Sequence, residues 1–195
     1  MADDERRLLE RLWRRDEAAF NELVRRHQGP VFRLLERMLG NSAEAEDVAQ
    51  DVFVSAFKAI DGFRGDSALG TWLYRIAANH GKNRLKYLAR RGKTGVRELD
   101  EQTAAVSAAA DARPITPVEQ VESQEAQGHL QQAFASLDEE QRLLLSLRDM
   151  ENMSYEEIRQ VTELPIGTVK SKLHRARLAL HERFTTLQQG LRVAR

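Results

Sequence analysis

Apolar residues recur at intervals of three and four through most of this chain, a spacing that predicts α-helices. The clearest run follows Asn41 and continues for about four turns: Ala45, Val48, Ala49, Val52, Phe53, Ala56, Phe57 and Ile60. Asn41, with Glu44 three residues later, resembles a capping box, in which two side chains satisfy the exposed amides at a helix start. The pattern predicts an all-α protein.

The segment before this helix predicts more helix. Residues 3–15 place Leu8, Leu9, Leu12 and Trp13 on one face, and Asp16 has the position of an N-cap for the next helix. We expect that helix to be interrupted at Gly29-Pro30, because proline lacks the amide that a helix interior uses, and to resume until Gly40.

A second stripe lies on the helix that follows Asn41, on a face away from its apolar residues. It consists of Asp47, Gln50, Asp51 and Val54. Solvated acids are the simplest interpretation. A docking face for a protein partner is the alternative, because Val54 adds an apolar contact beside the acids.

A strongly basic segment runs from Trp72 to Arg97. It holds eight Lys or Arg residues and no acid, although the formal net charge of the chain is zero. A helix beginning near Leu69 would turn one set of residues toward a core: Leu69, Trp72, Leu73, Ile76, Ala77 and His80. Another side would carry Arg75, Asn79, Lys82, Asn83 and Lys86. Such a face indicates a polyanionic partner, and a merely solvated basic face is the alternative.

The loop that precedes this basic helix is short and polar, apart from Phe63. Its residues are Phe63, Arg64, Gly65, Asp66 and Ser67. Gly65 permits backbone conformations closed to other residues, and Asp66 or Ser67 can cap the next helix. A loop pinned in this way is suited to holding a nucleotide, and an ordinary interhelical loop is the alternative.

The composition predicts two helical domains joined by an acidic linker. Residues 93–125 are rich in Ala, Thr, Ser, Gln and acids and have no sustained apolar period, so we expect a flexible linker there. Domains at 1–92 and 126–195 would flank it. Residues 98–125 contain seven acidic residues and one basic residue, Arg113, which gives a formal charge of 1 − 7 = −6.

The C-terminal part predicts a helix-turn-helix. Asp138 with Gln141, and Ser154 with Glu157, each form a capping box, and the helix after Ser154 is short. Residues 162–165 break it before a last long helix. In a helix-turn-helix the second helix enters the major groove with its first turns. The candidates for DNA contact are therefore Thr168, Lys170, Ser171, Lys172, His174 and Arg175. A small bundle with a solvated basic face is the alternative.

Several classes of function are disfavoured. The chain has no cysteine and five scattered histidines, so we expect no disulfide, no structural metal and no cofactor. No apolar run is long enough to cross a bilayer, and the charged N-terminus is unlike a secretory signal, which predicts a cytoplasmic protein. No catalytic constellation is visible, so we expect no enzymatic activity of its own.

Two long motifs resemble bacterial RNA polymerase sigma factors of the extracytoplasmic function (ECF) group, similar to sigma-E-like members. AEDVAQDVFVSAFKAIDGFRGDSALGTWLYRIAANHGKNRL resembles the family's core-binding and promoter-melting region, and SYEEIRQVTELPIGTVKSKLHRARLAL resembles its C-terminal helix-turn-helix. The resemblance covers nearly the whole chain in the family's order.

This resemblance implies roles for particular residues. The stripe of Asp47, Gln50, Asp51 and Val54 corresponds to the face that docks on the clamp of core RNA polymerase. The loop 63–67, with Asn79, corresponds to the site that holds a base flipped from the minus-10 non-template strand. Trp72, Arg75, Lys82, Asn83 and Lys86 would accompany it along the strand. The residues 168–175 would contact the minus-35 duplex. The resemblance also implies an anti-sigma factor as a partner.

Two positions depart from expectation, and one role stays open. Primary sigma factors have two adjacent tryptophans where this chain has Trp72-Leu73, so melting is expected to depend more on a strong promoter match. Arg159 occupies a helix crossing where helix-turn-helix domains generally have a small residue. Trp72 either packs in the core or stacks on DNA. The competing hypotheses for the chain are an autonomous duplex-binding regulator and a protein-binding helical adaptor.

Overall fold

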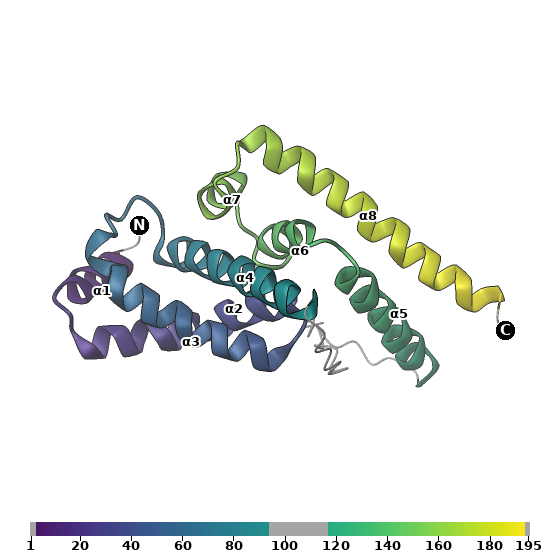
Figure 1. Ribbon diagram of the computed structural model, residues 1–195, viewed down its shortest axis with the longest axis horizontal. Helices are drawn as coiled ribbons and strands as arrows, with labels where there is room; N and C mark the ends of the chain where they lie inside the picture. Colours follow the sequence, from purple (N-terminus) through teal and green to yellow (C-terminus); the bar gives the residue numbers. More distant parts are fainter. Residues whose placement is uncertain (1–2, 94–116, 194–195) are drawn as a thin grey trace.

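The computed structural model describes residues 3–93 and 117–193, and every described element is helical. The N-terminal domain contains α1 (Asp3–Trp13), α2 (Glu17–Leu39), α3 (Ser42–Ala59), a 3-10 turn η1 (Ile60–Gly62) and α4 (Leu69–Lys93). The C-terminal domain contains α5 (Pro117–Ala135), α6 (Glu139–Leu145), a π-helical turn η2 (Ser146–Met150), α7 (Tyr155–Thr162) and α8 (Ile166–Val193). The all-α, two-domain prediction is confirmed in its fold class (Figure 1).

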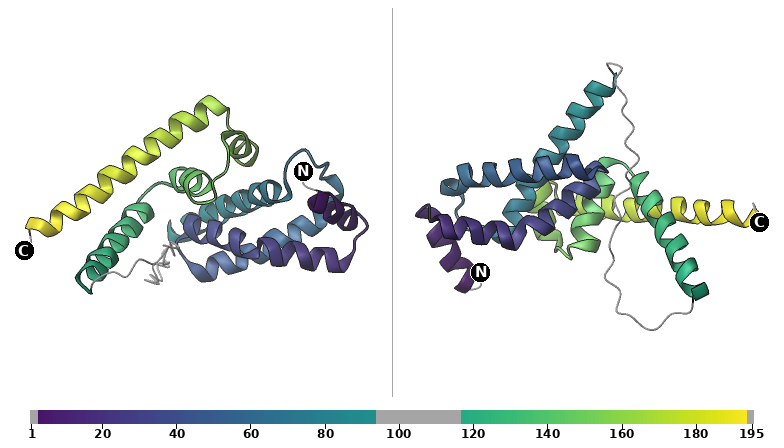
Figure 2. Two further views of the ribbon diagram at one scale, coloured as in Figure 1. Left: turned by 180° about the vertical axis from the view of Figure 1, so that it is seen from behind. Right: turned by 90° about the horizontal axis from the view of Figure 1, so that it is seen from below.

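Each domain buries the apolar face that its helices present. In the N-terminal domain, α2, α3 and α4 pack on one another and α1 lies against α2. The fully buried large side chains there are Leu12, Leu23, Leu34, Leu35, Met38, Ile60, Leu69 and Leu73. In the C-terminal domain they are Leu143, Leu144, Leu145 and Leu147, against which α7 adds Ile158 and α8 adds Leu173. From behind and from below, α8 projects away from the N-terminal domain (Figure 2).

Local caps fix the starts of α2, α3, α6 and α7 at the residues that the sequence predicts. The Asp16 carboxylate accepts from the amides of Ala18 and Ala19 at 2.8 and 3.3 Å, and Asn41 accepts from Glu44 at 2.9 Å. Asp138 and Ser154 both head complete capping boxes. At Asn41 only half of the predicted box forms, because the Glu44 carboxylate accepts from Arg84 instead.

The structure departs from the sequence-based expectation in the second helix, and it adds detail at Trp13 and at the linker. Helix α2 is continuous through Pro30, because buried Leu23 before it and buried Val31 and Leu34 after it share one face, and their packing outweighs the lost hydrogen bond. Trp13 is 43% exposed, although it shares one helix face with the buried residues Leu8, Leu9 and Leu12. Helix α5 begins at Pro117, inside the predicted linker 93–125, and residues 94–116 of that linker lie outside the described residues.

The two domains touch each other. Helix α7 packs on α4, and α6 packs on α2 (Figure 1). Glu151, which follows η2, uses both carboxylate oxygens across this interface: one is 2.9 Å from Arg37 Nη1 and the other accepts from the Tyr74 hydroxyl at 2.6 Å. Burial and this hydrogen bond raise the pKa of the Tyr74 hydroxyl. The ion pair is largely shielded from solvent, since both side chains are 12% exposed.

Candidate nucleic-acid and protein interfaces

The acidic stripe on α3 is available to a partner. Asp47, Gln50, Asp51 and Val54 are all exposed, and Val54 keeps 52% of its surface accessible. They alternate along α3 with the residues that hold it in the core, among them Val48 and Val52. The stripe thus presents carboxylates beside an apolar side chain on a rigid helix.

A groove between α2 and α3 borders this stripe. It measures about 650 Å³ and is lined by Val24, Phe32, Ala49 and Phe53, with Gln50 at the side that it shares with the stripe. The sequence analysis missed this groove, because the same apolar periodicity predicts only a buried face. With the groove included, the candidate docking surface is an apolar depression bordered by acids, rather than the acidic stripe alone.

The loop before α4 has an ordered shape. Gly65 has a φ of 78°, in the left-handed region that glycine adopts without strain. Phe63 is 7% exposed, and its ring stacks on Trp72 at 4.8 Å between centroids. Phe63, the one large apolar residue of this polar loop, therefore packs in the core together with Trp72, which is itself 5% exposed.

A hollow opens beside this loop. It measures about 150 Å³ and is lined by Gly62, Phe63, Arg64, Asp66, Ser67, Thr71, Trp72 and Arg75, with Gln160 of α7. A cavity of that size accommodates a six-membered ring. Phe63 and Trp72 thus contribute an aromatic lining to the hollow while remaining mostly buried. The hollow brings most residues of the loop together with Trp72 and Arg75, whereas Asn79, Lys82, Asn83 and Lys86 do not line it.

The start of α4 is held by a residue that the sequence analysis missed. Neither Asp66 nor Ser67 caps the helix as predicted: the Ser67 hydroxyl donates to the Ala68 carbonyl at 3.2 Å. The amide of Leu69 donates to the Glu5 carboxylate of α1 at 2.6 Å. No local pattern could have revealed this contact, because the two residues are 64 positions apart.

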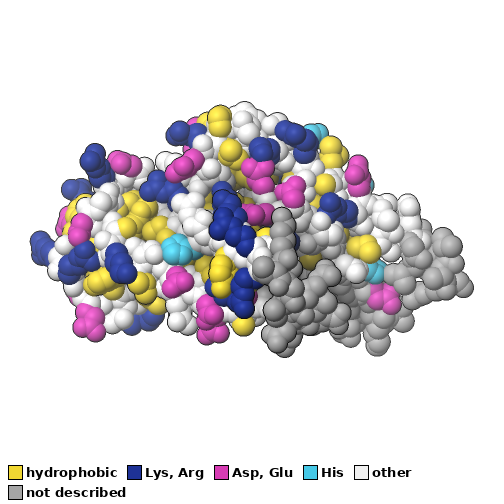
Figure 3. Space-filling view, in the orientation of Figure 1, with side chains coloured by type: hydrophobic (Ala, Val, Ile, Leu, Met, Phe, Trp, Pro, Cys, Tyr) yellow, Lys and Arg dark blue, Asp and Glu magenta, His cyan; other side chains and the backbone are white. Residues whose placement is uncertain are grey.

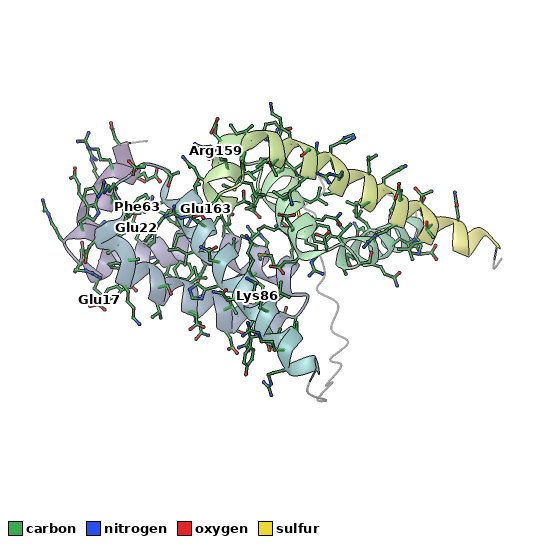
Figure 4. The ribbon with its side chains drawn as sticks, turned by 45° about the horizontal axis from the view of Figure 1, so that its top comes forward. Glu17, Glu22, Phe63, Lys86, Arg159 and Glu163 are labelled. Atoms are coloured by element: carbon green, nitrogen blue, oxygen red, sulfur yellow. The ribbon has the colours of Figure 1, made fainter. Side chains whose placement is uncertain are left out.

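The outer face of α4 continues from the loop as a polar and basic track. Arg75, Asn79, Asn83 and Lys86 are exposed and Lys82 is half-buried. Figure 4 shows Phe63 near the start of α4 and Lys86 toward its end. Arg84 faces elsewhere: it is paired with Glu44, and this hydrogen bond raises the pKa of its guanidinium. Along several turns of α4, the track can contact successive phosphates of a nucleic-acid strand.

The C-terminal domain contains the predicted helix-turn-helix. Helix α7 ends at Thr162, the following residue Glu163 is its C-cap with a left-handed φ of 61°, and α8 begins at Ile166. Val169, Leu173 and Ala176 fasten α8 to the core. The other side of its first turns exposes Lys170, Ser171, His174 and Arg175, with Thr168 half-buried. Lys172 differs from this group because it pairs with Glu140 of α6.

Arg159 does not disturb this motif. Its side chain is half exposed and pairs with Glu156 at 3.0 Å on the same helix. Figure 4 shows Arg159 and Glu163 on the C-terminal domain, at the side that lies over α4. Arg159, Glu163 and Pro165 line a second hollow together with Arg75 of α4. A long arginine is tolerated at the crossing because its charged end reaches solvent.

The surface carries mixed charge. On the face shown in Figure 3, Lys and Arg side chains spread over the N-terminal domain with Asp and Glu among them. Within residues 3–93 and 117–193, no group of three or more His, Cys, Asp or Glu side chains is arranged to hold a metal ion. No helix of that described part is long and apolar enough to cross a membrane.

Comparison with known proteins agrees with this division of the chain. Residues 23–91 match the model of sigma-70 region 2, and residues 128–180 match that of sigma-70 region 4. The RNA polymerase sigma-H factor of Pseudomonas aeruginosa is 36% identical over 192 residues, which are 98% of each chain. The ECF RNA polymerase sigma-E factor of Escherichia coli is 38% identical over 180 residues, covering 92% of this chain and 94% of that protein. This chain belongs to the ECF sigma factors.

Solved structures share the fold of this ECF sigma factor. CnrH, in complex with the cytosolic domain of CnrY, has a TM-score of 0.66 at 22% identity and covers 94% of this chain and 99% of its own. RpoE from Bartonella quintana, in complex with the anti-sigma factor NepR, has a TM-score of 0.65 at 21% identity, covering 85% and 96%. Sigma factors direct RNA polymerase to promoters. Membership of this family therefore confirms the function predicted from the sequence.

Proposed function

We propose that this sigma factor divides promoter recognition among three surfaces. The α3 stripe and its bordering groove bind core RNA polymerase. The loop 63–67 and the outer face of α4 bind the minus-10 non-template strand, and the first turns of α8 bind the minus-35 duplex. The observation that carries this proposal is the hollow beside Phe63, which adjoins the exposed polar track of α4.

Promoter opening by this arrangement needs no covalent catalysis from the sigma factor. Unstacking and unpairing a base costs a few kcal/mol, which capture of that base in a pocket offsets. Arg64, Asp66 and Ser67 supply polar groups around the hollow, while Phe63 and Trp72 supply an aromatic wall. Arg75, Lys82 and Lys86 along α4 neutralise phosphates of the same strand. Bond formation is left to the polymerase.

The recognition helix α8 supplies the duplex contacts. Its exposed Lys170 and Arg175 suit guanine edges or phosphates, and Ser171 and His174 lie between them. Lys170 is held 5.5 Å from the centre of the Tyr155 ring, a cation–π contact that orients its ammonium. Because Lys172 pairs with Glu140, Lys172 is a weaker candidate for phosphate contact.

Regulation by an anti-sigma factor is part of the proposal. The fold is shared with CnrH and RpoE, whose structures contain CnrY and the anti-sigma factor NepR, respectively. A regulator that covers the α3 stripe or the α4 track would prevent docking or strand binding. The proposed function places the protein in the cytoplasm with polymerase and DNA, or at the membrane if its anti-sigma factor is anchored there.

Transcription by purified bacterial core polymerase from a library of promoter fragments tests the function directly. We expect sequence-specific initiation only when core polymerase and this protein are both present. The recovered fragments would define the minus-10 and minus-35 sequences. Tight binding of a specific duplex by the protein alone, without initiation, would instead support an autonomous regulator.

Replacing Asn79 with alanine is expected to impair strand capture specifically. The Asn79 side chain is exposed, so the free energy of unfolding should change by less than about 0.5 kcal/mol. Loss of its hydrogen bonds to a base should weaken discrimination at the captured position by about 1–3 kcal/mol. Open-complex formation on fragments carrying each of the four bases measures this preference.

The control for Asn79→Ala is Asn21→Ala, which removes an exposed amide side chain from α2. It should open promoters at the wild-type rate. A wild-type base preference in Asn79→Ala would remove Asn79 from the capture site.

A further inference from the structure

Helix α1 lies outside the segment matched by the region 2 model, which begins at residue 23, yet it contacts the loop before α4 at both ends. The Trp13 indole N–H donates to the Phe63 carbonyl at 3.1 Å, where the loop begins. The Glu5 carboxylate accepts from the Leu69 amide at 2.6 Å, where the loop ends. The two side chains are eight residues apart, which is about 12 Å along a helix axis.

Both contacts satisfy groups that the loop itself leaves unpaired. The first amides of a helix have no partner within the helix, so the Leu69 amide requires an outside acceptor. A carboxylate at that position is also favoured by the helix dipole. Phe63 is fixed from two sides, because its ring stacks on Trp72 while Trp13 holds its carbonyl.

A third contact from the same region holds the segment that precedes the loop. Arg15, two residues after the end of α1, donates to the Phe57 carbonyl and to the Asp61 carboxylate. Its guanidinium also lies 4.9 Å from the centre of the Phe57 ring. The end of α3 and η1 are thereby fastened to the α1 segment just before the loop starts.

We propose that α1 is a positioning element for strand capture: Trp13 and Glu5 hold the ends of the loop 63–69 in the geometry that a flipped base requires. This inference rests on the proposed strand-capture role of the loop. Trp13 and Glu5 act through Phe63 and Leu69 and need not touch DNA. A loop whose ends are fixed before binding loses less conformational freedom when the base enters.

Side-chain substitutions in α1 test this proposal in the full chain bound to core polymerase. Trp13→Phe removes the indole N–H and keeps an aromatic ring, whereas Glu5→Ala removes the acceptor. Each should slow open-complex formation about 2- to 12-fold, the range expected for one hydrogen bond. Each should also broaden the base preference at the captured position. Promoter fragments recovered from the transcription library provide the DNA.

Two controls separate positioning from general loss of structure. Glu5→Gln retains a side-chain carbonyl for the Leu69 amide and should restore most of the opening rate. Glu10→Ala removes an exposed acid of the same helix, whose partner is Arg6 at 3.7 Å, and should behave as wild type. Because the chain has two tryptophans, Trp13→Phe also leaves Trp72 as the only indole. An unchanged Trp72 emission then shows that the Phe63–Trp72 stack persists.

The outcomes distinguish this inference from the proposed function. Slower opening and a broader base preference, with unchanged affinity for core polymerase, would support it. Wild-type opening and preference in both α1 variants, with Asn79→Ala impaired, would overturn the role of α1 and leave strand capture standing. Wild-type behaviour of all three variants would overturn both. Equal loss of polymerase affinity in Glu5→Gln and Glu5→Ala would assign Glu5 to folding alone and likewise overturn it.

Discussion

Replacing Asp51 with arginine is expected to abolish binding to core RNA polymerase while leaving the free protein folded. Asp51 is exposed on α3, between Gln50 and the apolar Val54, so its side chain contributes little to the core. In a complementary interface the substitution removes an attractive charge and introduces a repulsive one. We expect the dissociation constant to rise by at least about 100-fold, since like-charge juxtaposition costs several kcal/mol.

Fluorescence anisotropy of the labelled protein, titrated with core polymerase, measures this effect. Circular dichroism and thermal unfolding of the free variant check its fold. Glu10→Arg makes the same change of charge on α1, at a side chain that is 51% exposed, and should retain wild-type affinity. Wild-type affinity in Asp51→Arg would remove the α3 stripe from the docking surface and leave it as solvated acids.

Replacing Trp72 with alanine is expected to lower the free energy of unfolding by about 3–5 kcal/mol, the range for truncating a large buried aromatic side chain. Trp72 is 5% exposed and stacks on Phe63, so its removal leaves a cavity directly beneath the loop. The structure thus favours the core role over the DNA-stacking role that the sequence left as an alternative. The aromatic wall of the hollow would be lost as well.

Chemical denaturation of the free protein measures the effect of Trp72→Ala without any contribution from DNA. Trp13→Phe is the comparison at the other tryptophan, which is 43% exposed, and should cost about 1 kcal/mol for its hydrogen bond. If Trp72→Ala were as stable as wild type but failed to open promoters, Trp72 would have to leave the core to stack on a base.

The features that the sequence predicted well are those determined by neighbouring residues. Asp16, Asp138 and Ser154 cap helices because their side chains reach amides two or three positions ahead. The helix-turn-helix and the exposure of the α3 stripe follow in the same way from helical periodicity. The resemblance to a family added the order of the domains and their function, which local patterns do not contain.

The features that were missed depend on residues far apart in the chain. Pro30 is accommodated because α3 and α4 pack on both halves of α2, which the sequence around Gly29 does not reveal. Glu5 replaces the expected local cap of α4, and Phe63 is buried because Trp72 lies beside it. A loop that looks polar and open in the sequence therefore has its aromatic residue inside the domain.

Glu151 links the length of DNA that the molecule can span to the free energy of the contact between its two domains. Arg75 shares one hollow with Glu163 and Pro165, so the polar track of α4 and the helix-turn-helix lie side by side. The centres of the two promoter elements are about 25 base pairs apart, which is about 85 Å of duplex at 3.4 Å per pair. If the proposed assignment of these surfaces holds, occupying both elements would require Arg37 and Tyr74 to release Glu151.

Opening of the domains would then be an equilibrium that precedes promoter engagement. Every 1.4 kcal/mol by which the closed arrangement is favoured lowers the apparent affinity for the promoter about tenfold. One carboxylate at the end of a π-helical turn thus links the state of the free protein to the length of DNA that it can span.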